Sequence, residues 1–318
     1  MVTQQGKNVK VCAVRGNFDD CQRGVKETFA ALSGRDLHGK MLSSANSINI
    51  GRLVPQVVYY FAAYAQLLRS GEISEGEKVD FVVPTGNFGD ILAGYFAKLM
   101  GLPVGMLVCA SNANRVLTDF ITTGIYDRRR EFVRTTSPSM DILVSSNLER
   151  LLYLAAGCDG EKVSGYMEQL SRDGWYQVDA DTLAYIRESF ACACCDEAQT
   201  EEEIGRVWRE QGYLCDPHTA VAFSAARQYK NTAPGHNRTV ILSTASPYKF
   251  PTPVLRAIGG DVQGSEFEQM RRLSAMTGVR IPENLSGLES RTVIHSDVID
   301  RDGICAYVES LLEGEAWA

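Results

Sequence analysis

Apolar positions along this chain change period several times, from strand-like runs to helix-like repeats. Residues 8–14, NVKVCAV, form a short apolar run, and DDCQRGVKETFAAL after them repeats its apolar positions every three to four residues. The same pairing recurs in KVDFVVPTG followed by DILAGYFAKLMG, and in PVGMLVCAS followed by NRVLTDFITTG. Strands that alternate with helices predict an α/β fold with a parallel sheet and right-handed connections.

A longer apolar pattern lies between the first two of these pairs. It predicts one helix, and Pro55 fits its first turn or a kink. The apolar positions of this helix are Val54, Val57, Val58, Phe61 and Leu68. Residues 148–215 have a mainly helical and acidic pattern, which we interpret as a helical insertion over the sheet. A final α/β portion follows, with helix HTAVAFSAARQY, strand RTVILSTA and helix ICAYVESLLE, and KNTAPGHNR within it is linker-like.

The composition and net charge of the chain exclude several classes of protein and of ligand. The chain has 318 residues, 45% of them hydrophobic, and a net charge of −7, so we expect a globular protein that binds no nucleic acid. No apolar run reaches about 18 residues, so we expect no membrane partner. Nine cysteines, an odd number, do not form a secreted disulfide framework, and we expect reduced thiols in the cytoplasm. We interpret CACC at 192–195 as a helix and its end, and expect no metal site.

The stretch VVPTGNFGDILAGYF joins an apolar strand to an alanine-rich helix through a glycine-rich turn. Gly86 and Gly89 allow the backbone to approach a ligand, and the N–H groups there, with the helix N-terminus, can point at one anion. The turn is not a P-loop, because no Lys-Ser/Thr follows, and its spacing is not that of a dinucleotide fold. A phosphate cup and a turn without a ligand are both open from this loop alone.

A second set of donors lies at residues 46–52, NSINIGR. Asn46, Ser47 and Arg52 place an amide, a hydroxyl and a guanidinium around a helix start, a donor set that suits a phosphate dianion. The alternative is an N-cap by Ser47 or Asn46 with Arg52 in a surface ion pair, which explains Ser47 better than Arg52. Further along, DPHTAVAF is a good helix start, and the Thr219 hydroxyl could equally bond a ring nitrogen of a ligand.

Together these stretches resemble the threonine synthases, which are fold-type-II enzymes that use pyridoxal 5′-phosphate (PLP). The resemblance is carried by SANSINIGR, PTGNFGDILAGYFAK and DPHTAVAF, with GNFDDCQ, SSNLERLL and STASPYKFP, in one order from about residue 8 to the C-terminus. It implies PLP fold type II, a parallel-rich three-layer α/β sheet with a helical insertion. It also implies conversion of O-phospho-L-homoserine and water to L-threonine and phosphate, by γ-elimination and β-hydration.

The resemblance also implies roles for individual residues. The family's loop around the PLP phosphate matches Gly86, Asn87, Phe88, Gly89 and Asp90. Thr219 matches the residue whose hydroxyl meets the pyridine nitrogen of the cofactor. The group that holds the substrate phosphate matches Asn46, Ser47 and Arg52.

One part of the family pattern has no match in this sequence. The family's Schiff-base lysine lies in a Phe-Lys-Asp motif of an N-terminal segment, and the early lysines here stand in other contexts. We therefore expect residues 1–45 to be the remainder of the small domain, a β-α unit, and residues 46–318 to be the large α/β domain with its insertion at about 148–215. We expect no catalytic residue in this chain and no activity alone. We therefore expect the partner that supplies the lysine to be a separate N-terminal chain or another copy of this chain in a homo-oligomer.

Two alternatives to this hypothesis stay open. Another fold-type-II PLP lyase, such as a threonine dehydratase-like enzyme, has no substrate phosphate to hold, and the donors at 46–52 argue against it. A non-catalytic protein that binds PLP or phosphate, or one subunit of a split enzyme, needs the cofactor loop but not the lysine.

Overall fold

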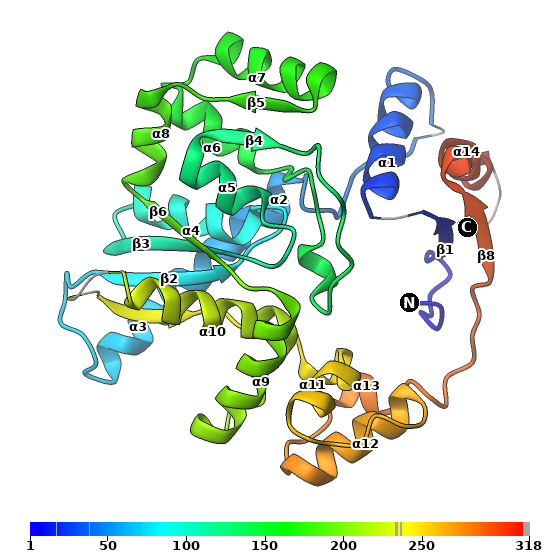
Figure 1. Cartoon of the computed structure of the whole chain (residues 1–318). Coiled ribbons are helices and arrows are strands. Elements are labelled where there is room, and N and C mark those ends of the chain that lie inside the picture. The colour runs from blue at the N-terminus through cyan, green and yellow to red at the C-terminus, as the bar shows by residue number, and fades with distance from the viewer. Residues whose placement is uncertain (17, 38, 233–234, 236, 314–318) are drawn as a thin grey trace. The chain divides into compact units, whose positions relative to one another are not determined.

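The computed structural model of the chain (Figure 1) describes residues 1–16, 18–37, 39–232, 235 and 237–313. The chain folds as two compact units, the smaller formed by Met1–Ser44 with Ile281–Ala318 and the larger by Ala45–Arg280. The smaller unit ends at Ser44 on its N-terminal side, and it also includes residues 281–318, which the domain prediction placed with residues 46–280.

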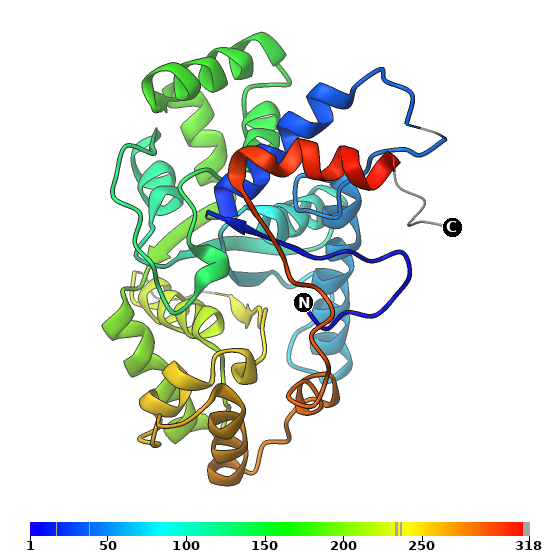
Figure 2. The same ribbon diagram turned by 90° about the vertical axis from the view of Figure 1, so that its right-hand side faces the viewer.

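The smaller unit is built around one strand and one longer helix from each end of the chain. Strand β1 (Cys12–Arg15) pairs in parallel with β8 (Asp297–Asp300), and α1 (Phe18–Leu32) packs against α14 (Ile304–Glu313), as Figures 1 and 2 both show. A Cβ atom added at Gly24 would lie 2.3 Å from the Ile304 side chain, so the two helices approach closely. This pairing joins positions nearly 300 residues apart, which a local hydrophobic period cannot reveal.

The larger unit contains a four-stranded sheet in which every strand is parallel to its neighbours. Its order is β6-β3-β2-β7. The bounds are Val79–Pro84 for β2, Val104–Ser111 for β3, Phe190–Cys194 for β6 and Arg238–Ile241 for β7. The central strand β2 is buried along its whole length, as expected for a parallel sheet covered on both faces.

Side chains of the sheet alternate between two helical layers. Phe81 and Leu107 pack on the side of α4 (Gly89–Leu99) and α5 (Val116–Thr123). Val82 and Val108 pack on the opposite side, against the alanine-rich face of α10 (Pro217–Lys230). Figure 1 shows α10 across the sheet from α4 and α5. The predicted three-layer arrangement around a parallel sheet is therefore confirmed.

The helix predicted around Pro55 is broken into two. A short α2 (Ile50–Leu53) is followed by a 3₁₀ turn at Val54–Gln56 and then by α3 (Val57–Arg69). Pro55 lies in the 3₁₀ turn, as its missing N–H and fixed φ favour. Val57 is buried, but Val54 and Val58 are 55% and 62% exposed, so the predicted apolar face is only partly covered.

The segment 148–215 is mainly helical, as predicted, and it also contains two strands. Strand β6 belongs to the main sheet, and β5 (Trp175–Gln177) pairs antiparallel with β4 (Ile125–Asp127). Cys192 and Cys194 therefore lie on a strand and not on a helix. A five-residue run of small apolar residues carries no usable period, so the sequence pattern could not separate the two. All nine cysteines lie among the described residues, and all are free thiols.

The remaining helices complete the larger unit and the C-terminal connection. They are α6 (Leu148–Ala155), α7 (Gly160–Asp173), α8 (Ala180–Arg187), α9 (Glu197–Gln211), α11 (Pro251–Ala257), α12 (Glu266–Thr277) and α13 (Glu283–Ser286). Within the described part of the chain, no helix is long and apolar enough to cross a membrane. The linker-like stretch KNTAPGHNR falls in part on residues 233, 234 and 236, which lie outside the described residues.

Candidate functional site

The glycine-rich turn between β2 and α4 takes its unusual shape at a phenylalanine. Phe88 has φ 60° and ψ 13°, the left-handed region, which costs a non-glycine residue about 1–2 kcal/mol. Its ring is 1% exposed and lies 5.5 Å from the ring of Phe190. Burial of a phenylalanine contributes roughly 1.5–3 kcal/mol, enough to offset the backbone cost. Phe88 therefore contributes only backbone to the surface of the turn.

The two glycines of the turn, Gly86 and Gly89, differ in how much space a side chain would find there. A Cβ atom at Gly86 would lie 2.7 Å from the carbonyl oxygen of Ser139 and 3.2 Å from the Cα atom of Met140, so a backbone segment packs directly on it. At Gly89 the nearest atom to an added Cβ would be the Asn147 amide nitrogen at 3.6 Å, an ordinary contact. Close approach of protein backbone thus explains Gly86, where the sequence pattern predicts the approach of a ligand.

Two carbonyl groups of the turn accept hydrogen bonds from residues 145–147. Gly86 O accepts a hydrogen bond from Ser145 Oγ at 2.9 Å, and Asn87 O accepts two, from Asn147 N at 3.1 Å and Asn147 Nδ2 at 2.8 Å. Within the described residues, no protein group accepts a hydrogen bond from the backbone N–H groups of residues 86–90. These five donors lie at the N-terminus of an 11-residue helix, where free N–H groups and the helix dipole favour an anion, and residues 86–90 are called the cradle below.

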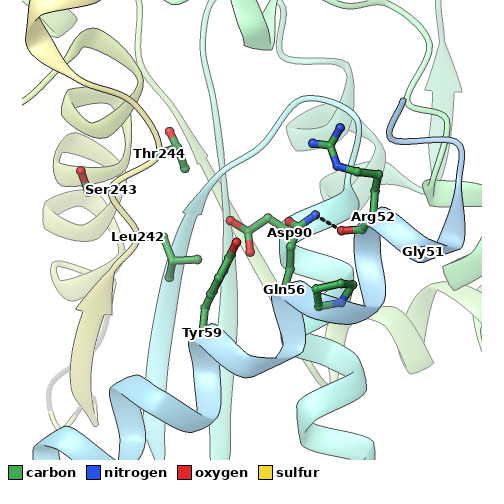
Figure 3. Close-up of a pocket in the computed structure, with 9 residues that line it drawn as sticks. Gly51, Arg52, Gln56, Tyr59, Asp90, Leu242, Ser243 and Thr244 are labelled. Carbon is green, nitrogen blue, oxygen red and sulfur yellow. Dashed lines mark hydrogen bonds between the residues drawn. The ribbon is translucent and has the colours of Figure 1, made fainter. Parts of the chain in front are cut away.

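A pocket of about 690 Å³ opens beside this cradle. Arg52 and Asp90 supply its charged lining, and Figure 3 shows Ser243 and Thr244 across the pocket from Arg52 and Gln56. The other lining residues are Gly51, Pro55, Tyr59 and Leu242. The pocket combines one cation, one acid and several hydroxyls, a set that can hold a small polar and anionic molecule.

Asp90 has a shifted pKa in this pocket. Burial raises its pKa to about 6, while a hydrogen bond from the Tyr60 hydroxyl acts in the opposite direction. The Tyr60 hydroxyl lies 2.8 Å from Asp90 O and 3.2 Å from Asp90 Oδ1. Burial and the neighbouring Asp90 in turn raise the pKa of Tyr60 well above its usual range. Asp90 therefore changes its charge at about pH 6, whereas Tyr60 stays protonated there.

Of the second donor set, at residues 46–52, Arg52 lines the pocket, whereas Asn46 and Ser47 do not. The guanidinium of Arg52 donates to the Ala45 carbonyl instead of joining the surface ion pair that was the alternative. Asn46 and Ser47 bond to each other, with Ser47 Oγ 3.1 Å from Asn46 Oδ1. The N-cap of α2 is Asn49, which accepts from Gly51 N at 2.8 Å. The alternative interpretation, an N-cap by Asn46 or Ser47, was therefore wrong, because the N-cap lies two to three residues further along the chain.

Arg150 and Asn147 connect the two donor sets, and sequence reasoning gave them no role. Arg150 Nη2 donates to Ile48 O at 2.9 Å, and Arg150 Nη1 donates to Asn147 Oδ1. Asn147 is fully buried and holds Asn87 O as described above. Both residues lie in SSNLERLL, one of the motifs that carry the family resemblance. That motif was the only feature of the sequence that could have pointed to these two residues.

Thr219 is linked to the pocket through a serine. Helix α10 begins where predicted, with Asp216 as its N-cap and Pro217 in its first turn. Thr219 Oγ1 donates to Asp216 Oδ2 and lies 3.4 Å from Ser243 Oγ, which lines the pocket. His218 Nδ1 lies 2.8 Å from Asp216 Oδ1. Asp216, His218 and Thr219 are all buried, so this network fixes the Thr219 hydroxyl firmly.

Comparison with known proteins agrees with these observations. The family model described as threonine synthase, C-terminal, matches residues 219–302. The chain is 42% identical over 264 residues to threonine synthase-like 1 of Macaca fascicularis, covering 81% of this chain and 35% of that protein. It is 42% identical over 257 residues to the threonine synthase of Pseudomonas aeruginosa, covering 81% of this chain and 53% of that protein. The PLP-bound threonine synthase of Brucella melitensis superposes with a TM-score of 0.78 and 38% identity, over 97% of this chain and 61% of that chain.

The parallel sheet, its two helical layers and the structural neighbours show the fold of the PLP enzymes of fold type II. Among these enzymes, the chain is similar to the threonine synthases, at 38% to 42% identity over 81% to 97% of its residues. It spans between about a third and about half the length of the curated relatives it matches, 35% to 53%.

Proposed function

We propose that this chain supplies the phosphate-binding part of a PLP-dependent lyase of the threonine synthase type. By similarity to the threonine synthases, the reaction would be conversion of O-phospho-L-homoserine and water to L-threonine and phosphate. The observation that carries the proposal is the cradle of five unpartnered N–H groups at residues 86–90, among the described residues, beside the pocket that Arg52 lines.

The residues present fit the phosphate of the cofactor. Gly86, Asn87, Phe88, Gly89 and Asp90 would hold it through backbone N–H groups and the α4 helix dipole. When bound, PLP supplies an electron sink for carbanions. Thr219, held by Asp216 and close to Ser243, would then meet the cofactor ring.

Arg52 is the group best placed to hold the phosphate of the substrate. Its guanidinium is always charged and can make charge-assisted hydrogen bonds to a phosphate dianion. We include Asn46 and Ser47 in the same site, because they lie in the turn that leads to α2 and Arg52. The hydroxyls of Ser243 and Thr244 would contact the substrate from the opposite wall.

The Schiff-base lysine is proposed to come from outside this set of residues. The described residues that line the pocket include no lysine. Lys98, at the far end of α4, donates from Nζ to Gly105 O at 2.9 Å. We therefore propose that the chain alone binds PLP through phosphate and ring contacts but makes no threonine. A separate N-terminal chain or a homo-oligomer in the cytoplasm would complete the enzyme.

The cradle is tested by comparing two ligands that differ only in the phosphate. PLP and pyridoxal are each titrated against the purified chain by equilibrium dialysis. We expect PLP to bind at least about 30-fold more tightly, since several charge-assisted hydrogen bonds are at stake. Equal affinities for the two compounds would contradict the proposal.

The source of the lysine is tested separately. After PLP is added, borohydride reduction and peptide mass spectrometry should find no stoichiometric pyridoxyl group on any lysine. Threonine should form from O-phospho-L-homoserine only when the N-terminal portion of a related threonine synthase is co-expressed. A single fully labelled lysine, or activity of the chain alone, would show that a lysine of this chain performs the role.

A further inference from the structure

We propose that Arg150 is a positioning residue that couples the cofactor-phosphate cradle at 86–90 to the substrate segment at 46–52. An anion bound at one of the two sites then strengthens binding at the other. The inference rests on the proposed function, because it needs both sites to be used.

Two side chains make a continuous connection between the sites. Arg150 donates to Ile48 O at 2.9 Å and to Asn147 Oδ1. Asn147 donates from its side chain and from its backbone to Asn87 O, at 2.8 and 3.1 Å. The planar guanidinium presents its donors in a fixed fork, so it holds both acceptors in one geometry.

Because each peptide unit is planar, a hydrogen bond to its carbonyl oxygen also fixes the direction of its N–H group. Asn87 O and the N–H of Phe88 belong to one trans peptide unit and point in opposite directions, so a held carbonyl fixes a cradle donor. Ile48 O belongs in the same way to the peptide unit of Asn49, the N-cap of α2. Arg52 lies on α2, and its orientation therefore depends on the bond from Arg150.

The position of Asn147 supports a role beyond local stability. It is the N-cap of α6, where an asparagine side chain usually accepts from the helix and contributes about 1 kcal/mol. Here the side chain makes no cap hydrogen bond. It is fully buried, and its amide is directed to Asn87 while its oxygen accepts from Arg150. The local helix start is left without its side-chain cap in favour of the connection.

The physical basis of the coupling is shared ordering. A ligand in the cradle restricts the peptide units that Asn147 holds, and the restriction passes through Arg150 to Ile48. The second ligand then meets a segment whose freedom has already been reduced, which strengthens its binding. Thermodynamic linkage requires the effect to be equal in both directions.

The test measures the affinity for PLP in the absence and presence of saturating O-phospho-L-homoserine. In the wild-type chain we expect the second ligand to tighten PLP binding at least fivefold. In R150K, which keeps the charge but loses the fork, we expect a change of less than twofold relative to the affinity of that variant for PLP alone. R187K is the matched control, because Arg187 Nε donates to Ile121 O at 3.0 Å and Nη2 to Thr122 O, away from the pocket lining. It should retain the full coupling.

A second variant keeps the test decisive if R150K unfolds. Asn147→Asp retains an acceptor for Arg150 but loses the side-chain donor to Asn87, so it should also reduce the coupling. Full coupling in whichever variants fold would overturn the inference, as would the same loss of coupling in R187K. If the wild-type chain binds both ligands independently, only this inference fails. If it does not bind PLP, the proposed function fails with it.

Discussion

In the proposed site, Arg52 is the residue that would distinguish a phosphate-bearing substrate from an unphosphorylated one. Replacement by alanine removes charge-assisted hydrogen bonds worth about 1.5–3 kcal/mol, so O-phospho-L-homoserine should bind roughly 10- to 100-fold more weakly. PLP binding should change little, because the cradle uses other residues. Isothermal titration of both ligands checks this. Arg69→Ala, an exposed residue in the last turn of α3, is the control. An unchanged affinity for O-phospho-L-homoserine would favour an unphosphorylated substrate.

Asp90 makes stability depend on pH in a defined direction. Its pKa rises from 3.8 in the unfolded chain to about 6 in the folded protein, so the folded state holds the proton more tightly. Stability from this group is therefore present below about pH 4 and lost as the pH rises through 6, by up to about 3 kcal/mol. Asp90→Asn retains an acceptor for Tyr60 and removes the charge.

The free energy of unfolding of wild type and of Asp90→Asn, measured with urea between pH 4 and 8, checks this prediction. The variant should gain stability relative to wild type as the pH rises. Its advantage should be smallest at about pH 4, should grow mainly between about pH 4 and 6, and should reach its full size above about pH 7. A difference that is constant across this range would mean that Asp90 keeps an ordinary pKa.

At the scale of single elements, the turn before α4 offers a matched pair of glycine substitutions. Gly86→Ala places a Cβ atom 2.7 Å from a backbone oxygen, so the segment at Ser139 must move, at a cost of about 1–3 kcal/mol. Gly89→Ala meets only an ordinary contact at 3.6 Å, and its stability should stay within about 0.5 kcal/mol of wild type. Thermal unfolding of the two variants gives the comparison. Equal effects would show that the turn relaxes around Gly86.

The sequence predicts most elements of the sheet and fewer details of the site. The apolar runs located β2, β3 and β7, and the helix start at Asp216 followed from ordinary capping chemistry. Strand β6 was missed because Phe190–Cys194 is too short to show a period. The left-handed residue of the turn is Phe88 and neither of the glycines, because burial of its ring compensates for backbone strain. Such tertiary compensation is invisible to local propensity.

The connection through Arg150 and Asn147 shows the same limit more clearly. The residues were visible in a motif, but their roles depend on acceptors 60 and 102 positions away in the chain. Spacing along the sequence gives no information about such partners. Arg52, by contrast, could be identified because helix capping did not explain it, and the structure does place it at the pocket.

At the scale of the whole molecule, the two units differ in which parts of the chain they need in order to fold. Both apolar clusters of the core are formed by residues between Leu53 and Ala226, inside the larger unit. The smaller unit joins the two ends of the chain, through β1 with β8 and α1 with α14. Its stability should therefore depend on the C-terminal segment, whereas that of the larger unit should not.

Removal of residues 281–318 tests this division. In the shortened chain, the amides of Ala13 and Val14 should lose protection against hydrogen exchange, because β8 supplies the partner strand for β1. The amides of Phe81 and Val82 in β2 should keep their protection, since their neighbours β3 and β7 are still present. PLP should still bind, because residues 86–90 and Arg52 lie in the larger unit. Retained protection at β1 would mean that the N-terminal segment is ordered without β8, and lost protection at β2 would mean that the two units unfold together.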